Sequence, residues 1–323
     1  MASSTYITDE LRSLRNGGLL QRLRGGDEIA YLITLASAVG ILLLVALLVL
    51  ELWSNSQPTV KTFGWSFLTS SKWDPNSGKF GALPFIYGTC VTSLLALIIA
   101  VPLGVASSIF LAEMAPPKFS NILTFLIELL AAVPSVIYGL LGIFILVPLI
   151  RAYLVPVLTK TLGFLPIFQG DFYGVSFLSA GLVLSVMVVP FIISVSREVL
   201  IAVPVEQREA ALALGATKWE ATWQIVIPNA STGIIGSVFL ALARALGETM
   251  AVTMVIGNTP KITASLLSPG YSIAAVIANE FAEASGSLYI SSLIFLGLVL
   301  FGLTIVINAM ARLLILTTSR RGV

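Results

Sequence analysis

The sequence predicts an all-α membrane protein with six transmembrane helices. Of its 323 residues, 57% are hydrophobic and only 11% are charged, and the mean hydropathy is +0.99. In soluble domains about 25% of residues are charged, so this chain is far more apolar than they are. Its apolar residues also gather in blocks long enough to cross a hydrocarbon core of about 30 Å at about 1.5 Å per residue. Both observations indicate a polytopic membrane protein.

Polar or proline-rich segments separate the predicted spans. The spans cover residues 29–53, 84–111, 122–150, 175–194, 234–256 and 288–316. The block 122–150 is too long for one upright helix, and Pro134 is expected to break it. We expect external loops at 54–83 and 151–173 and a half-buried helix near the outer mouth within 273–284. The organisation is thus a first helix, an external loop, and a core over residues 84–316 that holds five helices and a polar hairpin at 204–228.

Positive charge indicates which way the chain is inserted. Six spans place both termini on one side, which carries eleven Lys and Arg residues, at positions 12, 15, 22, 24, 118, 197, 208, 218, 312, 320 and 321. The other side carries six, at positions 61, 72, 79, 151, 160 and 261. Because Lys and Arg are enriched in cytoplasmic loops, the hairpin and the tails 1–28 and 317–323 are predicted to be cytoplasmic. Residues 1–28 lack the apolar core and cleavage site of a secretory signal, so we expect this tail to be retained.

The composition excludes several kinds of chemistry. The chain has no histidine and one cysteine, Cys90, which is predicted to lie within a span. Zinc sites built from Cys and His, histidine acid–base catalysis and intrachain disulfides are therefore excluded. The sequence also has no G-x-x-x-x-G-K-[ST] phosphate-binding loop. We expect that the chain is not an enzyme and has no metal or cofactor of its own.

The polar hairpin at 204–228 has clear helix signals. A helix is predicted from Val205, with Gly215 as a left-handed C-terminal cap. Thr217-x-x-Glu220 is a capping box that opens a second helix, which is expected to end near Pro228. Most hairpins between spans are only solvated connections, so these signals alone leave the role of the hairpin open.

The residue types and spacing in the hairpin resemble a known sequence motif. Glu209-Ala210-Ala211, Gly215 four positions later, and Ile-Val-Ile ending at Pro228 are similar to the EAA loop of the membrane subunits of ABC importers. The resemblance implies a type I ABC importer (MetI-like) permease fold, with a cytoplasmic coupling helix that docks on a separate ATP-hydrolysing subunit.

The fifth predicted span contains two charged residues. Arg244 and Glu248 are four positions apart, so on one helix they would share a face. Either charge in hydrocarbon costs at least about 2.5 to 3.5 kcal/mol, so both should face protein or a water-filled path. Two interpretations remain open at this point: a substrate path, or an ion pair that only holds helices together.

Two further segments restrict the resemblance to one kind of ABC importer permease. The run from Arg244 to Ala251, continuing to Asn258, is similar to the span found in the C-type permeases of phosphate-specific (Pst) importers, and the Pro-Ser-x-x-Tyr-Gly element at 134–139 is similar to another segment of these permeases. Sulfate and molybdate permeases typically carry an aromatic residue and glycine after Gly-Glu. Thr249 and Met250 follow here, which favours phosphate. Ser135 and Tyr138 would supply hydroxyl groups beside a proline kink, although helix packing through small residues explains the element equally well.

The resemblance implies a phosphate importer permease in a prokaryotic cytoplasmic membrane. The substrate path would include Arg244, Glu248, Thr249, Asn258, Ser135 and Tyr138. Glu248 would either accept a hydrogen bond from the acidic hydroxyl of phosphate and repel sulfate, or serve only as a counter-charge to Arg244. The implied partners are membrane lipid, a second (A-type) permease, two ATP-binding subunits that use ATP and magnesium, and an external phosphate-binding protein; nucleic acid is not among them. The alternatives are a sulfate or molybdate permease and, in another class, a secondary transporter or channel that needs no ATPase.

Overall fold

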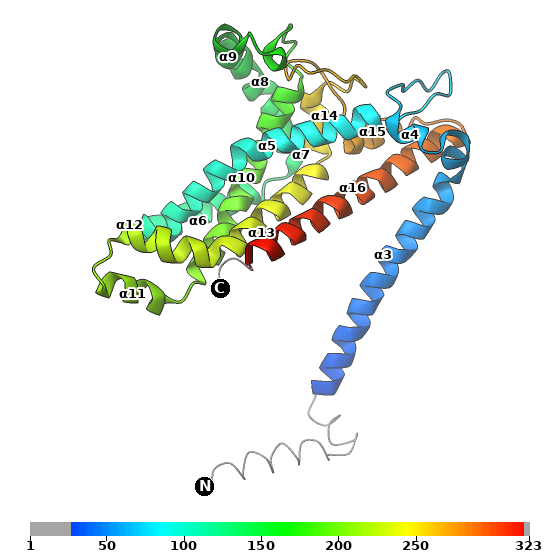
Figure 1. The fold of residues 1–323 in the computed structure, drawn as a ribbon. Helices are drawn as coiled ribbons and strands as arrows, with labels where there is room; N and C mark the ends of the chain where they lie inside the picture. The colour runs from blue at the N-terminus through cyan, green and yellow to red at the C-terminus, as the bar shows by residue number, and fades with distance from the viewer. Residues whose placement is uncertain (1–26, 320–323) are drawn as a thin grey trace. The chain divides into compact units, whose positions relative to one another are not determined.

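A computed structural model describes residues 27–319, and every regular element in that range is a helix (Figure 1). Six of these helical stretches are long and apolar enough to span a membrane: Ala30–Phe63, Leu83–Met114, Ser135–Leu162, Phe177–Ile201, Lys218–Leu246 and Ser287–Leu313. The six predicted spans are therefore confirmed in number. The chain forms two compact units, residues 1–54 and 55–323. The predicted tail at 1–28 lies outside the described residues except for its last two positions.

The first helix is longer than predicted. α3 runs from Asp27 to Phe63 without a break at Pro58, so residues 54–63 are helical and do not belong to an external loop. Within the second unit, its last turns are fixed to α16 (Ser287–Ser319) by buried hydroxyl groups. Thr59 Oγ1 donates to Ser291 Oγ at 2.8 Å and lies 3.1 Å from Ser292 Oγ. Polar side chains such as these are common in loops, and for that reason residues 54–63 were predicted to be a loop. In the structure they form a helix–helix contact.

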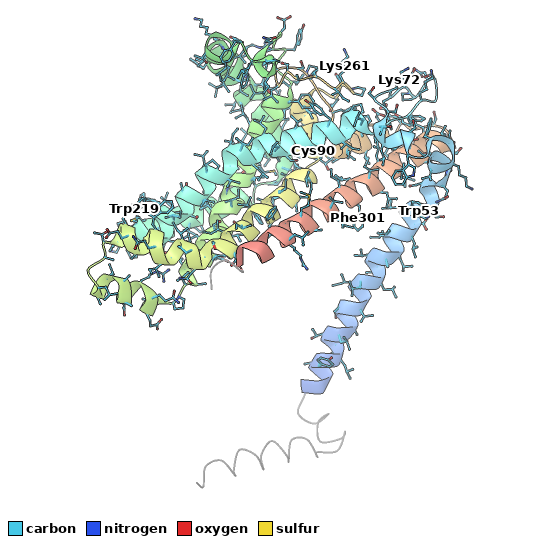
Figure 2. All side chains as sticks on the ribbon, in the orientation of Figure 1. Trp53, Lys72, Cys90, Trp219, Lys261 and Phe301 are labelled. Carbon is cyan, nitrogen blue, oxygen red and sulfur yellow. The ribbon has the colours of Figure 1, made fainter. Side chains whose placement is uncertain are left out.

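α10 (Phe177–Ile201) is the central helix of the second unit. It packs against α5 (Leu83–Ile109), α6 (Pro117–Ala131) and α13 (Ile227–Leu246). Small residues on α5, including Ala96 and Ala100, are fully buried at this core and permit close helix approach. Cys90 also lies on α5, half-buried, as predicted (Figure 2).

Proline positions explain where the helices widen. The described residues contain four π-helical turns: η1 (Phe110–Met114), η2 (Gly142–Leu146), η3 (Ile150–Leu154) and η5 (Thr222–Val226). In each case a proline follows the last residue of the turn by two positions, at Pro116, Pro148, Pro156 and Pro228. Proline has no N–H and its ring clashes with the carbonyl four residues earlier. A π turn widens the helix at that point, so at the last three of these prolines the helix continues.

Because helices continue past these prolines, two predicted helix boundaries are wrong, at the end of the third span and at the end of the hairpin. The third span continues through η2, α8 (Val147–Leu149), η3 and α9 (Val155–Leu162), so residues 151–162 are helical and only the rest of the predicted loop at 151–173 lies outside the span. The second helix of the hairpin does not end near Pro228. It passes through η5 into α13, and Asn229 Nδ2 donates to the Ile225 carbonyl oxygen at 2.7 Å beside the proline.

The helix expected within 273–284 is confirmed as α15 (Ile273–Glu280). Its Glu280 carboxylate accepts hydrogen bonds from Trp73 Nε1 at 2.9 Å and from the Tyr289 hydroxyl at 2.6 Å. Trp73 packs edge-on against Phe85, and burial raises the pKa of nearby Tyr271 to about 12. An aromatic cluster therefore joins the loop after α4 (Ser66–Thr69) to α5, α15 and α16.

Candidate functional site

Two breaks between consecutive helices lie at the ends of candidate membrane spans, one before Ser135 and one after Leu246. α6 ends at Ala131 and α7 (Ser135–Leu141) begins after Pro134, so the predicted break is confirmed. α13 ends at Leu246 and α14 (Met250–Ile256) begins four residues later. α7 packs against α14, and at Gly139 an added Cβ would lie 2.6 Å from Met254 Sδ and 3.2 Å from Ala251 Cα. A side chain at this position would therefore force Met254 to move, and a larger one would press on the α14 backbone.

The predicted shared helical face of Arg244 and Glu248 is wrong. Arg244 lies in the last turn of α13, whereas Glu248 lies in the break before α14. Gly247, a poor helix former, follows the end of α13. Glu248 Oε1 then accepts the backbone N–H of Ala251 at 3.2 Å, which satisfies a free donor in the first turn of α14.

Arg244 has no counter-ion among the residues that the structure describes. Its side chain is exposed, and the guanidinium carbon lies 5.8 Å from the centre of the Phe191 ring. A guanidinium presents a planar fork of donors that suits an oxyanion. The break between α13 and α14 therefore offers an arginine whose charge is not neutralised by a carboxylate of this part of the chain.

Three of the other predicted site residues lie next to one of the two helix breaks. Tyr138 is buried and donates from its hydroxyl to the Leu130 carbonyl oxygen at 2.7 Å. Ser135 lies half-buried one turn earlier, at the start of α7. Thr249 lies in the α13–α14 break, where Oγ1 donates to the Gly247 carbonyl oxygen at 3.3 Å.

Asn258 is not brought to the same place. It lies beyond the far end of α14, seven residues and about 10 Å along the helix axis from the break. Its φ is +48°, and Nδ2 donates to the Thr253 carbonyl oxygen at 3.1 Å. Asn258 therefore follows Gly257, the left-handed residue that caps α14, and lies at the opposite end of this helix from the break.

The hairpin has most of the predicted local structure. α11 spans Val205–Ala213, Gly215 has φ +89°, and both hydrogen bonds of the Thr217–Glu220 capping box are present before α12 (Lys218–Ala221). Glu209 and Ala210 are exposed, whereas Ala211 is buried. A hollow of about 490 Å³ lies between α11 and the α12–α13 helix, lined by Gln207, Ala210, Ala211, Leu214, Gln224 and Asn229 among others. Leu214 at the turn is 90% exposed, so the hairpin presents an apolar tip and a hollow.

Removing the cap should loosen this hairpin. In a Thr217→Ala variant, the loss of the Oγ1 contacts to the Glu220 N–H at 3.3 Å and carboxylate at 2.8 Å should cost about 1 kcal/mol. Hydrogen exchange of the first-turn amides of α12 should then become about fivefold faster. Thr161→Ala, which removes an exposed hydroxyl on α9, is the control. Equal exchange in both variants would show that the cap does not hold the hairpin.

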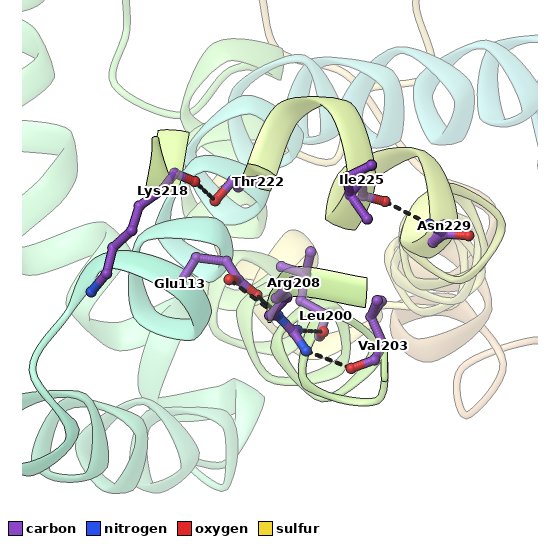
Figure 3. A network of polar contacts seen from close by, with 8 residues as sticks. All are labelled: Glu113, Leu200, Val203, Arg208, Lys218, Thr222, Ile225 and Asn229. Carbon is purple, nitrogen blue, oxygen red and sulfur yellow. Dashed lines mark hydrogen bonds and ion pairs between the residues drawn. The ribbon is translucent and has the colours of Figure 1, made fainter. Parts of the chain in front are cut away.

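Sequence reasoning missed one interaction at the hairpin. Arg208 entered the sequence analysis only as a positive charge, yet in the structure its Nη2 lies 2.9 Å from Glu113 Oε1 (Figure 3). The two residues are 95 positions apart, and each has an ordinary solvated role in its own segment. Nothing in the local sequence pairs them.

Comparison with known proteins assigns the class. The family described as "Binding-protein-dependent transport system inner membrane component" matches residues 100–319. A solved bacterial ABC transporter "involved in the import of the acidic polysaccharide alginate" aligns over 91% of this chain and 98% of its own, with a TM-score of 0.56 and 17% identity. An inward-facing MetNI methionine ABC transporter aligns over 74% and 94% with a TM-score of 0.50 and 16% identity. The chain thus has the fold of the membrane subunits of type I ABC importers and is a multi-pass inner membrane protein.

Curated relatives narrow the class to one family. The phosphate transport system permease protein PstC of Xylella fastidiosa is 46% identical over 323 residues, 99% of each chain. The PstC of Mesorhizobium japonicum is 43% identical over 96% of each chain, and a probable PstC of Methanocaldococcus jannaschii is 35% identical over 88% of this chain and 92% of its own. The chain belongs to the PstC family of transport system permease proteins. The predicted fold class and family are both confirmed.

Proposed function

We propose that this chain is the permease subunit that carries inorganic phosphate through an ATP-driven importer into the cytoplasm. The observation that carries the proposal is Arg244, an exposed arginine without a counter-ion in the described chain, at a break in a membrane helix. Phosphate is an oxyanion that the guanidinium fork can bind in a bidentate manner. Identity to PstC proteins over nearly the whole chain supports phosphate above other oxyanions.

The transport cycle would use several chains. We assign ATP and magnesium to two ATP-binding subunits, which the cytoplasmic hairpin contacts through Glu209, Ala210, Ala211, Gly215 and Pro228. A second, A-type permease would complete the path, and an external phosphate-binding protein would deliver the ion. One arginine is a sparse site for phosphate, so the second permease would contribute further cations. In this arrangement both termini are cytoplasmic and the chain itself catalyses no reaction.

Uptake into liposomes tests the assignment. The complete assembly is reconstituted, the binding protein is added outside, and uptake of labelled phosphate is measured with excess sulfate as competitor. We expect uptake that requires ATP and is insensitive to sulfate. Competition by sulfate would indicate that the substrate is a related oxyanion. Uptake without ATP would exclude an ATP-driven importer.

Glu248→Gln tests the selectivity hypothesis for this carboxylate. Gln keeps an oxygen that can accept the Ala251 N–H, now 3.2 Å from the Glu248 carboxylate, but it removes the negative charge. If the carboxylate repels sulfate, the variant should transport sulfate at a rate at least about tenfold above wild type, since one like-charge contact is worth about 1.4 kcal/mol or more. Continued exclusion of sulfate, with only the phosphate rate altered, would limit Glu248 to capping α14.

A further inference from the structure

Arg208 points away from solvent although it lies on the cytoplasmic hairpin. Its side chain is 19% exposed and that of its partner Glu113 is 11% exposed. Nε donates to both Glu113 carboxylate oxygens at 3.2 and 3.3 Å, and Nη2 donates to Oε1 at 2.9 Å. This is the forked contact that a guanidinium makes with a carboxylate, and it fixes orientation as well as distance.

The same guanidinium also binds the end of α10. Nη2 donates to the Leu200 carbonyl oxygen at 2.6 Å, and Nη1 donates to the Val203 carbonyl oxygen (Figure 3). The last carbonyl groups of a helix lack partners within the helix, and a cation is favourable at this negative end. Arg208 therefore caps α10, the most buried span, while it is paired with Glu113.

Three elements converge on one side chain. Glu113 lies in η1, at the end of the second span, Leu200 lies in the last turn of α10, and Arg208 lies in α11. We call Arg208, Glu113 and the carbonyl groups of Leu200 and Val203 the Arg208 network. Because the contacts are short, largely buried and made by all three guanidinium nitrogens, α11 cannot shift without moving both span ends or breaking the network.

Two consecutive residues of α11 face in different directions. Glu209 is exposed and available to a partner, whereas Arg208, one position earlier, is turned inward. A partner that moves α11 through Glu209 therefore acts one residue away from Arg208, whose side chain contacts the ends of two membrane spans.

We propose that the Arg208 network transmits movement of the hairpin to α10 and to the second span, so that Arg208 and Glu113 are positioning residues for energy coupling. The proposal rests on the proposed function, in which an ATP-binding subunit moves the hairpin. It places the mechanical link in charged side chains of this chain and not in the hairpin backbone alone, which continues into α13 through Thr222–Val226.

The test uses the complete assembly in liposomes with Arg208→Met, Arg208→Lys and Glu113→Gln variants. ATP hydrolysis and phosphate uptake are measured on the same vesicles, with Arg312→Met, an exposed arginine on α16, as the matched control. We expect at least half of the hydrolysis to persist in Arg208→Met while phosphate moved per ATP falls at least tenfold. Arg208→Lys, which keeps the charge but loses the fork, and Glu113→Gln should fall between this variant and wild type. Loss of hydrolysis and uptake in equal proportion would mean that the network only supports folding, and would overturn the proposal.

A second readout does not depend on the substrate. Hydrogen exchange of peptides covering Phe110–Met114 is compared with and without a non-hydrolysable ATP analogue. We expect ATP to alter exchange there in wild type, but to alter exchange only at the hairpin in Arg208→Met. An equal response of these peptides in both proteins would overturn the proposal. If wild type imports no phosphate but shows the ATP response, the substrate assignment fails and the coupling proposal stands.

Discussion

Replacing Arg244 by alanine should reduce ATP-driven phosphate uptake by at least about 100-fold while the assembly still forms. Arg244 is exposed at the end of α13 and lacks a counter-ion among the described residues, so its removal leaves no buried carboxylate unpaired. Two hydrogen bonds from a guanidinium to an anion contribute about 1.5 to 3 kcal/mol each, and each 1.4 kcal/mol is a factor of about 10. The measurement is the initial uptake rate, normalised to the amount of assembled complex.

Basal ATP hydrolysis should survive in the Arg244→Ala assembly. Arg244 lies sixteen positions after Pro228 on α13, which places it about 24 Å along the helix axis from the hairpin. Arg244→Lys keeps the charge but not the fork and should reduce uptake about tenfold. Arg312→Ala, at an exposed position of α16, should leave uptake unchanged. Normal phosphate uptake by Arg244→Ala would show that the anion follows another route and would remove the observation on which the proposed function rests.

Signals confined to a few neighbouring residues predicted the structure well. The capping box at Thr217, the left-handed Gly215 and the break at Pro134 each depend on backbone chemistry within about one helical turn, and all three are present. The number of spans was also predictable, because it depends only on the length of apolar blocks.

Predictions that required continuity of a helix were less reliable. Proline indicates a break, yet a preceding π turn lets the helix pass Pro156 and Pro228, and no residue pattern in the sequence signals that choice. The reverse error occurred at Gly247 and Glu248, where a span expected to be continuous is interrupted and the assumed four-residue spacing no longer describes one face.

Contacts between distant segments could not be predicted from one sequence. Arg208 and Glu113 each have an ordinary role in their own segments, and only the folded chain places their side chains 2.9 Å apart. The same limit applies to Tyr138, whose bond to the Leu130 carbonyl oxygen crosses the α6–α7 break. Arg244 was identified by its charge within an apolar span and Tyr138 by the proline beside it, and the resemblance added Thr249, while their relative placement required the packing of α7 on α14.

That packing makes Gly139 the position at which a small change should have a large effect. A Cβ there would lie 2.6 Å from Met254 Sδ, which can move, and 3.2 Å from Ala251 Cα, which is backbone. Gly139→Ala should therefore be partly tolerated, whereas the branched side chain of Gly139→Val must push α7 away from α14. Overpacking of this kind costs about 1 to 3 kcal/mol or more. Because α7 carries Tyr138 and α14 follows the break that holds Thr249, we expect Gly139→Val to reduce phosphate uptake at least tenfold.

A second substitution separates the two contacts of Gly139. Met254→Ala removes the sulfur atom, so it should restore uptake in Gly139→Ala but not in Gly139→Val, where the contact with the Ala251 backbone remains. Gly302→Val is the matched control, since no atom lies within 4 Å of the Cβ position at this glycine of α16. Uptake is normalised to co-purified partner subunits, so that poor assembly is distinguished from a distorted path. If Gly139→Val transports phosphate as wild type does, α7 and α14 can separate without loss of function, and the close contact between the two interrupted helices is not what holds the site.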